Sequence, residues 1–163
     1  MQLNLSKIRT DGGTQPRAAL RQEVILEYQE QMEAGMTFPP PTVFFDGQEY
    51  WLADGFHRLA AAAHAFPNNL IECEVRQGTV QDAQWFSYSA NQSHGLRRTN
   101  EDKRRAVIAA LSHPVGAKLS DANIAEHCGV SHPFVGKLRG ELSATCNDFK
   151  SPARTGRDGR TIN

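Results

Sequence analysis

The C-terminal third of the chain carries the pattern that most restricts its fold: two short helices joined by a tight turn. Helices are predicted through residue 127 and through residue 142, with Ser120 and Ser131 as their N-caps. Helices packed this closely need a small residue where they cross, and Ala125 supplies it. Gly129 tolerates the positive φ of the turn, and Val135 anchors the second helix. The other residues expected in this apolar wedge are Ile124, Val130 and Leu138.

This spacing predicts a helix-turn-helix, a motif whose second helix lies in the major groove of DNA. The residues expected to reach DNA from that helix are Ser131, His132, Phe134, Lys137 and Arg139. A second basic cluster precedes the pair and consists of Arg97, Arg98, Lys103, Arg104 and Arg105. Its cations could bind DNA phosphates or a nucleotide, and charge alone does not decide between the two. We therefore expect double-stranded DNA as a partner, with a helical hairpin of no DNA function as the alternative.

Charge is divided unevenly between the two halves of the chain. The whole sequence has 18 Lys/Arg and 18 Asp/Glu and therefore no net charge. Residues 1–90 carry 6 Lys/Arg and 11 Asp/Glu, a net charge of −5, whereas residues 91–163 carry 12 and 7, a net charge of +5. Such an asymmetry is expected when one half of a protein meets a polyanion. The distribution of charge thus favours DNA binding by the C-terminal half.

Composition argues against several other classes of protein. No stretch reaches the ~18 apolar residues of a membrane span, and the N-terminus lacks the basic patch and apolar run of a signal peptide. Cys73, Cys128 and Cys146 are far apart and form no Cys-x-x-Cys pair, which disfavours a disulfide framework and a zinc ribbon. We expect a globular protein of the cytoplasm, associated with a nucleoid or a plasmid.

The N-terminal part mixes strand and helix signals without a regular βαβ rhythm, which predicts an α+β fold. An Asp46-Gly47 turn predicts a hairpin between strands at residues 42–45 and 49–53. Cys73 is expected in the core, on a strand whose apolar residues alternate. The other expected strands lie at residues 3–8 and 70–76. The other expected helices lie at residues 19–34, 79–90 and 100–112, and Asn100 is expected to cap the last of them. A further helix, rich in alanine, is expected to end at Pro67.

The hairpin leads into the sequence Asp54-Gly55-Phe56-His57-Arg58 at the start of the alanine-rich helix. A strand, a glycine turn and a helix start can form an anion site, because N–H groups at a helix N-terminus point outward and the helix dipole favours negative charge. Gly55 allows close approach of the backbone, and His57 and Arg58 add hydrogen-bond donors. The pattern is consistent with a phosphate site, and an ordinary helix start is the alternative.

The order of these elements resembles that of the ParB family, in which a ParB/sulfiredoxin-like domain precedes a helix-turn-helix. The likeness covers about residues 5–142 and is carried by Gln15-Pro16-Arg17, by residues 52–61 around the glycine turn, and by Ala90-Asn91-Gln92-Ser93-His94. In that family the turn usually reads Gly-Glu-Arg-Arg and holds the triphosphate of CTP. The resemblance implies CTP, or else ATP or ADP, with Mg²⁺ as a companion ion. The nucleotide-binding residues that it implies are Gln15, Arg17, Gly55, His57, Arg58, Asn91 and His94.

The sequence departs from the ParB pattern at positions that bear on catalysis. Phe56 and His57 stand where the family has glutamate and arginine, and Ala90 and His94 stand in a motif that reads Glu-Asn-x-x-Arg in ParB. The acidic residue that assists metal-bound phosphate is therefore missing. Phe56 also replaces the nucleophilic cysteine of the sulfiredoxin motif Gly-Cys-His-Arg. We expect nucleotide binding without catalysis, and assign no catalytic or metal-binding residue.

Three functions are open on the sequence alone. The leading one is a DNA-binding protein of plasmid or chromosome partition or of transcription control, in which a bound nucleotide acts as a switch. The second is an enzyme: a ParB-like nuclease, a nucleotide-dependent phosphotransferase or a weak nucleoside triphosphatase. The third is an N-terminal domain that serves only as a scaffold for other proteins. A homodimer is expected, because a two-fold DNA site requires two copies.

Three regions are expected along the chain. A nucleotide-binding domain covers residues 1–90, a helical DNA-binding domain covers residues 91–142, and a basic tail without regular structure covers residues 143–163. The tail is poor in apolar residues and contains the cations Lys150, Arg154, Arg157 and Arg160.

Overall fold

The computed structural model describes residues 1–15, 17, 19–66, 68–90, 97–145, 154–156 and 160–162. The chain divides into two compact units. The N-terminal unit contains Met1–Gln15 and Ala19–Ser87, and the C-terminal unit contains Pro16–Ala18 and Tyr88–Asn163. The short segment 16–18 therefore belongs to the C-terminal unit although both of its sequence neighbours belong to the other.

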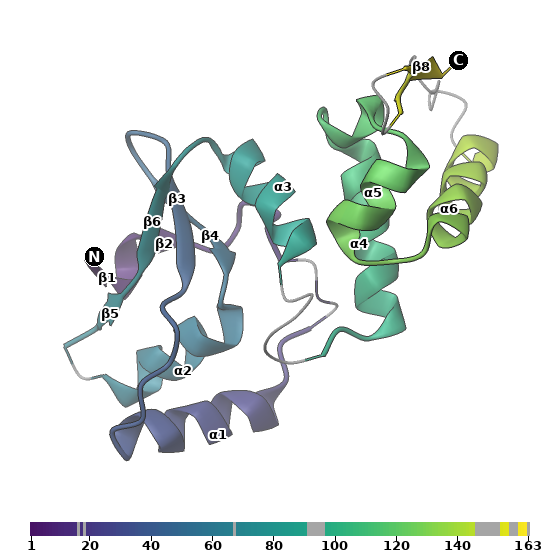
Figure 1. Ribbon diagram of the computed structural model, residues 1–163. Coiled ribbons are helices and arrows are strands. Elements are labelled where there is room, and N and C mark those ends of the chain that lie inside the picture. Colours follow the sequence, from purple (N-terminus) through teal and green to yellow (C-terminus); the bar gives the residue numbers. More distant parts are fainter. Residues whose placement is uncertain are drawn as a thin grey trace. The chain divides into compact units, whose positions relative to one another are not determined.

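A four-stranded mixed sheet forms the centre of the N-terminal unit (Figure 1). Its strands lie in the order β2 (Ile8–Arg9), β4 (Tyr50–Asp54), β3 (Thr42–Phe45) and β6 (Glu74–Gln77). The central pair β3–β4 is antiparallel, and the two outer pairs are parallel. The predicted hairpin is thus confirmed, and Gly47 in its connection has a φ of 102°.

Two predicted strands are each divided in the structure. The expected strand at residues 3–8 consists of β1 (Gln2–Asn4), a 3-10 turn at Leu5–Lys7 and β2. The expected strand at residues 70–76 is divided at Cys73 into β5 (Leu70–Glu72), which pairs with β1, and β6, which pairs with β3. Cys73 is 2% exposed, so its prediction as a core residue is confirmed.

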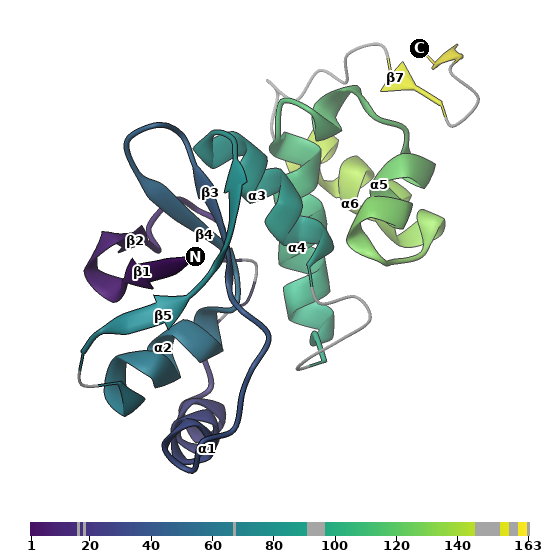
Figure 2. The ribbon, with the colours of Figure 1, turned by 60° about the vertical axis from the view of Figure 1, so that its left-hand side comes forward.

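Helices cover both faces of the sheet of the N-terminal unit (Figure 2). Successive residues of a strand point to opposite faces. Val43 and Leu52 enter the core under α1 (Gln22–Glu33) and α2 (Phe56–Ala65), while the alternate residues Phe44 and Ala53 pack against α3 (Val80–Ser89). The predicted α+β class is confirmed.

The C-terminal unit is mainly helical, and contains α4 (Asn100–Ser112), α5 (Asp121–Cys128) and α6 (His132–Thr145). A 3-10 turn at Gly116–Lys118 connects α4 to α5. The apolar core consists of Val107, Leu111, Ile124, Val135 and Leu138, none of them more than 1% exposed. Among the residues that the structure describes, no helix has both the length and the apolar composition needed to cross a membrane.

Capping side chains fix where these helices begin. Ser120 accepts a hydrogen bond from the Asn123 N–H at 3.3 Å and caps α5, as predicted. The cap of α4 is Thr99 and not the predicted Asn100. Thr99 Oγ1 accepts from the Asp102 N–H at 3.1 Å, and Asp102 Oδ2 accepts from the Thr99 N–H at 2.9 Å. Thr99 prevails because Asp102 stands three residues later and completes this reciprocal capping box.

The segment expected to lack regular structure contains two short strands. β7 (Arg154–Thr155) pairs antiparallel with β8 (Thr161–Ile162), and Thr155 also forms a bridge with Leu119. The prediction of a tail without regular structure is therefore wrong for these residues and for the last turn of α6. The bridge joins positions far apart in the sequence, which composition cannot reveal.

Candidate functional site

The turn into α2 has the backbone geometry expected of an anion site. Gly55 is the N-cap residue and has a left-handed φ of 98°. A Cβ there would lie 3.0 Å from Pro41 Cβ and 3.1 Å from Pro41 Cα, so the position requires glycine. The first backbone hydrogen bond of α2 runs from the Leu59 N–H to the Gly55 carbonyl at 2.8 Å. The N–H groups before Leu59 therefore lie at the positive end of the helix dipole.

His57 is an internal residue that links two helices. It is 7% exposed, and its Nε2 accepts a hydrogen bond at 3.0 Å from the backbone N–H of Arg21, the N-cap residue of α1. An accepting Nε2 is unprotonated, so this nitrogen offers no donor to a phosphate. In this structure the Nε2 atom of His57 therefore holds the start of α1, and the phosphate contact expected of this residue stays a prediction that concerns its other N–H groups.

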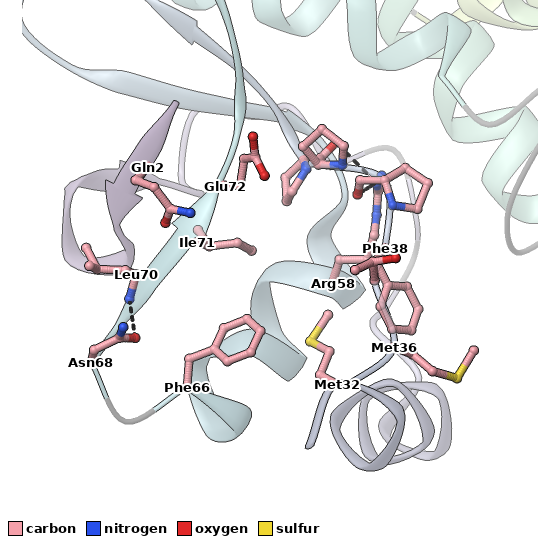
Figure 3. A pocket seen from close by; sticks show the side chains of 14 residues that line it. Gln2, Met32, Met36, Phe38, Arg58, Phe66, Asn68, Leu70, Ile71 and Glu72 are labelled. Carbon is pink, nitrogen blue, oxygen red and sulfur yellow. Dashed lines mark hydrogen bonds between the residues drawn. The ribbon is translucent and has the colours of Figure 1, made fainter. Parts of the chain in front are cut away.

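Arg58 lies at one end of a cavity of about 360 Å³ in the N-terminal unit (Figure 3). Its Nη2 is 2.8 Å from Asp54 Oδ2, and its Nη1 donates to the carbonyl oxygens of Pro39 and Pro40. Asp54 therefore neutralises the guanidinium in this structure. An anion that binds Arg58 has to compete with this carboxylate.

The wall of the cavity is mostly apolar, with a few polar groups. The bonds of Arg58 to the Pro39 and Pro40 carbonyls place it beside the proline segment, and Figure 3 shows Phe66 on another side of the cavity. Such a lining suits a flat heterocycle that carries an anionic group toward Arg58. The other lining residues are Gln2, Met36, Thr37, Phe38, Pro39, Pro40, Pro41, Asn68, Leu70, Ile71 and Glu72.

Two further predicted nucleotide ligands, Gln15 and Arg17, belong to different units of the chain. Gln15 is half-buried in the N-terminal unit. Arg17 belongs to the C-terminal unit, where its Nη1 lies 3.7 Å from Oδ2 of Asp102, the carboxylate of the α4 capping box. Both side chains of this pair are largely buried. Asn91 and His94 lie outside the described residues.

The helix pair α5–α6 packs as the sequence predicts. Ala125 is 6% exposed at the crossing, and Ile124, Val135 and Leu138 fill the space between the helices. Gly129 adopts a left-handed φ of 64° and ends α5. The Ser131 carbonyl accepts from the Phe134 N–H at 3.1 Å and the Val135 N–H at 3.3 Å, which begins α6. This packing fixes the angle between the two helices.

One side of α6 is open to solvent. Ser131, His132, Pro133 and Lys137 are exposed, and Phe134 is half-buried. Pro133 and Lys137 are four residues apart and therefore share one side of the helix, whereas Ser131 and His132 lie at its N-terminal end. Lys137 places a cation on this side, where it could reach a phosphate or a base edge.

Arg139, in contrast, is buried against α5 and is not available to DNA. It is 6% exposed, its Nε donates to Asp121 Oδ1 at 2.6 Å, and its Nη2 donates to the Leu119 carbonyl at 3.1 Å. The expectation that Arg139 faces DNA is wrong. Positions 135, 138 and 139 lie on one helix face, so the face that buries Leu138 also carries Arg139 inward to Asp121.

Arg98 is the second predicted DNA contact that proves to be internal. It is 9% exposed and donates through Nη1 to the Tyr88 carbonyl at 2.9 Å and through Nη2 to the Cys128 carbonyl. Burial lowers the pKa of the guanidinium, which still keeps its proton at neutral pH because an arginine starts from so high a value. Arg98 joins the ends of α3 and α5 and is not a phosphate ligand here.

The rest of the upstream basic cluster lies at the surface. Arg97, Arg104 and Arg105 are exposed, and Lys103 is half-buried. Arg104 lies 2.7 Å from Glu141 Oε2, and Arg105 lies 3.4 Å from Glu101 Oε1. Exposed pairs of this kind contribute little to stability, so a phosphate could replace either glutamate at small cost.

The structure also assigns roles to three residues that the sequence did not single out. Asp54 holds Arg58, Asp121 holds Arg139, and Thr99 caps α4. Asp54 stands four residues before Arg58, a spacing from which the sequence could have predicted their ion pair. Asp121 stands 18 residues before Arg139, so local spacing could not have predicted that pair. Among the described residues, no three His, Cys, Asp or Glu side chains are grouped to hold a metal ion.

No family model matches the chain. A possible regulatory protein of the streptomycin biosynthesis operon of Streptomyces griseus is 34% identical over 110 residues, which cover 66% of this chain. The matched region is only 29% of the length of that protein, so the chain spans less than a third of it.

Solved structures of C-terminally truncated chromosome-partitioning protein ParB from Caulobacter crescentus are similar to this chain. The complex with the centromeric parS site has a TM-score of 0.57 and 18% identity, over 85% of this chain and 69% of that one. The complex with CTP-γ-S has a TM-score of 0.50 and 15% identity, over 91% of this chain and 88% of that one. At such identities the likeness establishes the fold. The chain therefore has the ParB fold, an α+β unit followed by a helical unit.

Proposed function

We propose that the protein binds double-stranded DNA through α5 and α6, which act as a helix-turn-helix. The observation that carries this proposal is the buried wedge of α5–α6, which leaves Ser131 and His132 exposed at the N-terminal end of α6 and Lys137 exposed on its solvent side. The second helix of such a motif enters the major groove with its N-terminal residues toward the bases. The excess of positive charge in residues 91–163 and the fold shared with a parS-bound ParB support the same conclusion.

The proposed contacts differ from the first expectation by two residues. Arg98 and Arg139 are removed, because both are buried and hold other parts of the C-terminal unit. Ser131, His132, Phe134 and Lys137 remain as contacts of α6. The proposed phosphate contacts upstream are Arg97, Lys103, Arg104 and Arg105.

Fluorescence anisotropy with a labelled duplex, repeated over a series of salt concentrations, tests this proposal. Lys137→Ala should weaken binding and reduce the slope of log affinity against log salt by about 1, the effect of one lost phosphate contact. Arg76→Ala is a matched control, because Arg76 is an exposed cation of the N-terminal unit. No association of the unmodified chain with any duplex, or an association independent of salt, would contradict the proposal.

We propose further that the N-terminal unit binds a nucleotide, CTP in the first place, with phosphates at the start of α2. Gly55 provides the turn, Arg58 provides the charge, and the cavity beside Arg58 provides an apolar wall. The shared fold with a ParB bound to CTP-γ-S supports this assignment. Gln15, Arg17, Asn91 and His94 complete the proposed site by resemblance, and Mg²⁺ would accompany the phosphates. His57 acts as a positioning residue through its bond to Arg21.

Calorimetric titration with CTP, ATP and ADP in the presence of Mg²⁺ tests the nucleotide site. Arg58→Ala should abolish or strongly weaken the heat of binding. Arg9→Ala is the matched control, since Arg9 is also an arginine of this unit paired with an aspartate, Asp11. Flat titrations with all three nucleotides would refute the site and favour a scaffold role, while DNA binding would stand unaffected. Analysis of the same samples for nucleoside diphosphate detects any hydrolysis.

The biological role that we propose is transcription regulation or partition, exerted by a homodimer on a two-fold site. The similarity to a possible regulatory protein of a biosynthesis operon favours regulation, and the ParB fold favours partition. Deletion of the gene distinguishes them, because a regulator changes transcript levels of neighbouring genes and a partition protein changes inheritance of the DNA molecule. Light scattering of the chain with and without DNA measures the oligomeric state.

A further inference from the structure

The short hairpin β7–β8 lies after α6 in the sequence and returns to the beginning of α5 (Figures 1 and 2). The Thr155 carbonyl accepts hydrogen bonds from the Ser120 N–H at 3.1 Å and from Asn123 Nδ2 at 3.3 Å. Thr155 also bridges to Leu119. The Gly156 N–H donates to the Arg160 carbonyl at 2.7 Å, which closes the hairpin. The hairpin is thus fixed to the first helix of the proposed helix-turn-helix.

A shared carboxylate ties the hairpin to both helices. Asp121 Oδ1, in the first turn of α5, lies 2.6 Å from Arg139 Nε of α6 and 3.8 Å from Arg154 Nη1 of β7. All three side chains are at most 22% exposed. A partly buried ion cluster of this kind holds its members in a defined geometry. The position of the hairpin relative to α6 is therefore set by side-chain chemistry as well as by backbone pairing.

The charge of the hairpin suits a polyanion. Residues 154–162 contain three arginines and one aspartate, a net charge of +2, and Arg160 is exposed. In a helix-turn-helix complex the first helix crosses the DNA backbone while the second lies in the groove. A basic hairpin attached to the start of the first helix is therefore placed near phosphates that flank the groove.

We propose that the β7–β8 hairpin is a third DNA-contacting element, in which Arg160 binds a backbone phosphate beside the groove that α6 enters. This inference rests on the proposed DNA binding by α5 and α6. The hairpin acts as a wing on the helix pair: Asn123 and the Asp121 cluster position it, and Arg160 makes the contact. A basic segment that was not anchored would attract DNA too, but its contribution would not depend on Asn123.

Duplex binding by the full chain, measured by anisotropy over a salt series, tests the wing. Arg160→Ala should weaken binding roughly three- to tenfold and lower the salt slope by about 1, and Arg160→Lys should restore most of both. Asn123→Ala removes one of the two side-chain anchors, the other being the Asp121–Arg154 pair, without changing charge, and should also weaken binding. In the Arg160→Ala background, Asn123→Ala should have little further effect, because the two residues act through one contact. Thermal unfolding of each variant verifies that the chain is folded.

Three results separate the possible failures. If Lys137→Ala weakens binding while Arg160→Ala leaves affinity and salt slope unchanged, the wing is refuted and the helix-turn-helix stands. If Arg160→Ala weakens binding but the double variant Asn123→Ala/Arg154→Ala, which removes both side-chain anchors, binds as the unmodified chain does, the anchoring of the hairpin plays no part and the wing is again refuted. If the unmodified chain binds no duplex, the proposed function itself fails.

Discussion

Gly55 shows at the scale of a single residue how backbone geometry restricts the choice of amino acid. Gly55 and Gly47 have nearly equal φ values, 98° and 102°, but differ in their surroundings. A Cβ at Gly55 would press on Pro41, whereas a Cβ at Gly47 would have nothing within 4 Å. The pair therefore separates the effect of conformation from the effect of crowding.

We expect Gly47→Ala to lower the free energy of unfolding by about 1 kcal/mol, because alanine is strained in the left-handed region. Gly55→Ala should cost up to about 3 kcal/mol, because strain is added to the contact with Pro41. Urea unfolding followed by circular dichroism measures both values. Equal losses of unfolding free energy in the two variants would show that the backbone moves to relieve the contact of the new Cβ with Pro41. The turn would then be less rigid than the structure implies.

The buried cysteines give a pH dependence that can be assigned to one residue. Burial raises the pKa of Cys128 to about 12 and that of Cys73 to about 11, from ordinary values near 9. An unfolded chain releases these protons above about pH 9, whereas the folded chain retains them. The contribution of Cys128 to stability is therefore complete below pH 9 and is lost as the pH rises toward 12.

The free energy of unfolding, measured at intervals between pH 8 and pH 11, should fall more steeply for the unmodified chain than for Cys128→Ala. The comparison is needed because lysines and tyrosines titrate in the same range. Parallel curves would mean that the Cys128 thiol ionises in the folded protein as readily as in the unfolded one.

At the scale of single residues, the sequence predicted roles that depend on nearby residues better than it predicted contacts with distant ones. Gly129, Ala125 and Val135 were correctly placed, because their roles depend on neighbours within one helical hairpin. Arg139 was placed on the wrong side, because its partner Asp121 belongs to another helix. Local periodicity reports which residues share a face, but not what that face meets.

At the scale of an element, the start of α4 shows two adjacent residues that compete for the cap. Thr99 and Asn100 are both good N-cap residues. Thr99 is used because Asp102 stands at the third helical position and returns a hydrogen bond to the Thr99 N–H. Asn100 instead becomes the first residue of the helix and is exposed.

We expect Thr99→Ala to destabilise the chain by about 1 kcal/mol, the usual cost of removing a cap. Asn100→Ala should change stability by less than about 0.5 kcal/mol, because that side chain is exposed and makes no cap. Chemical unfolding of the two variants under identical conditions provides the comparison. The assignment would be overturned by a larger loss in Asn100→Ala than in Thr99→Ala.

Whole elements were predicted where their signals are local, and missed where pairing is long-range. The β3–β4 hairpin follows from an Asp-Gly turn between β-branched and aromatic residues, and the structure has it at the expected place. The division of residues 70–77 between two sheets depends on β1 and β3, which are distant in sequence. The same reason explains why β7 and β8 were not expected.

At the scale of the whole molecule, we propose that Arg17 couples nucleotide binding to DNA binding. Arg17 is a proposed phosphate ligand by resemblance, yet in this structure it pairs with Asp102 of the α4 capping box. A nucleotide that binds Arg17 would break the ion pair between Arg17 and Asp102, the carboxylate that caps α4. Because binding free energies are linked, any such effect of nucleotide on DNA affinity must be matched by an equal effect of DNA on nucleotide affinity.

The most direct test of a nucleotide-responsive DNA-binding protein is the dissociation constant for a duplex at zero and at saturating CTP with Mg²⁺. The constant for CTP is then measured with and without duplex. We predict that CTP changes the dissociation constant for the duplex by the same factor by which the duplex changes the dissociation constant for CTP. This factor should lie between about 5 and 150, the range typical of coupled sites. Equal DNA affinity at zero and saturating CTP, in a chain that binds both ligands, would contradict the account.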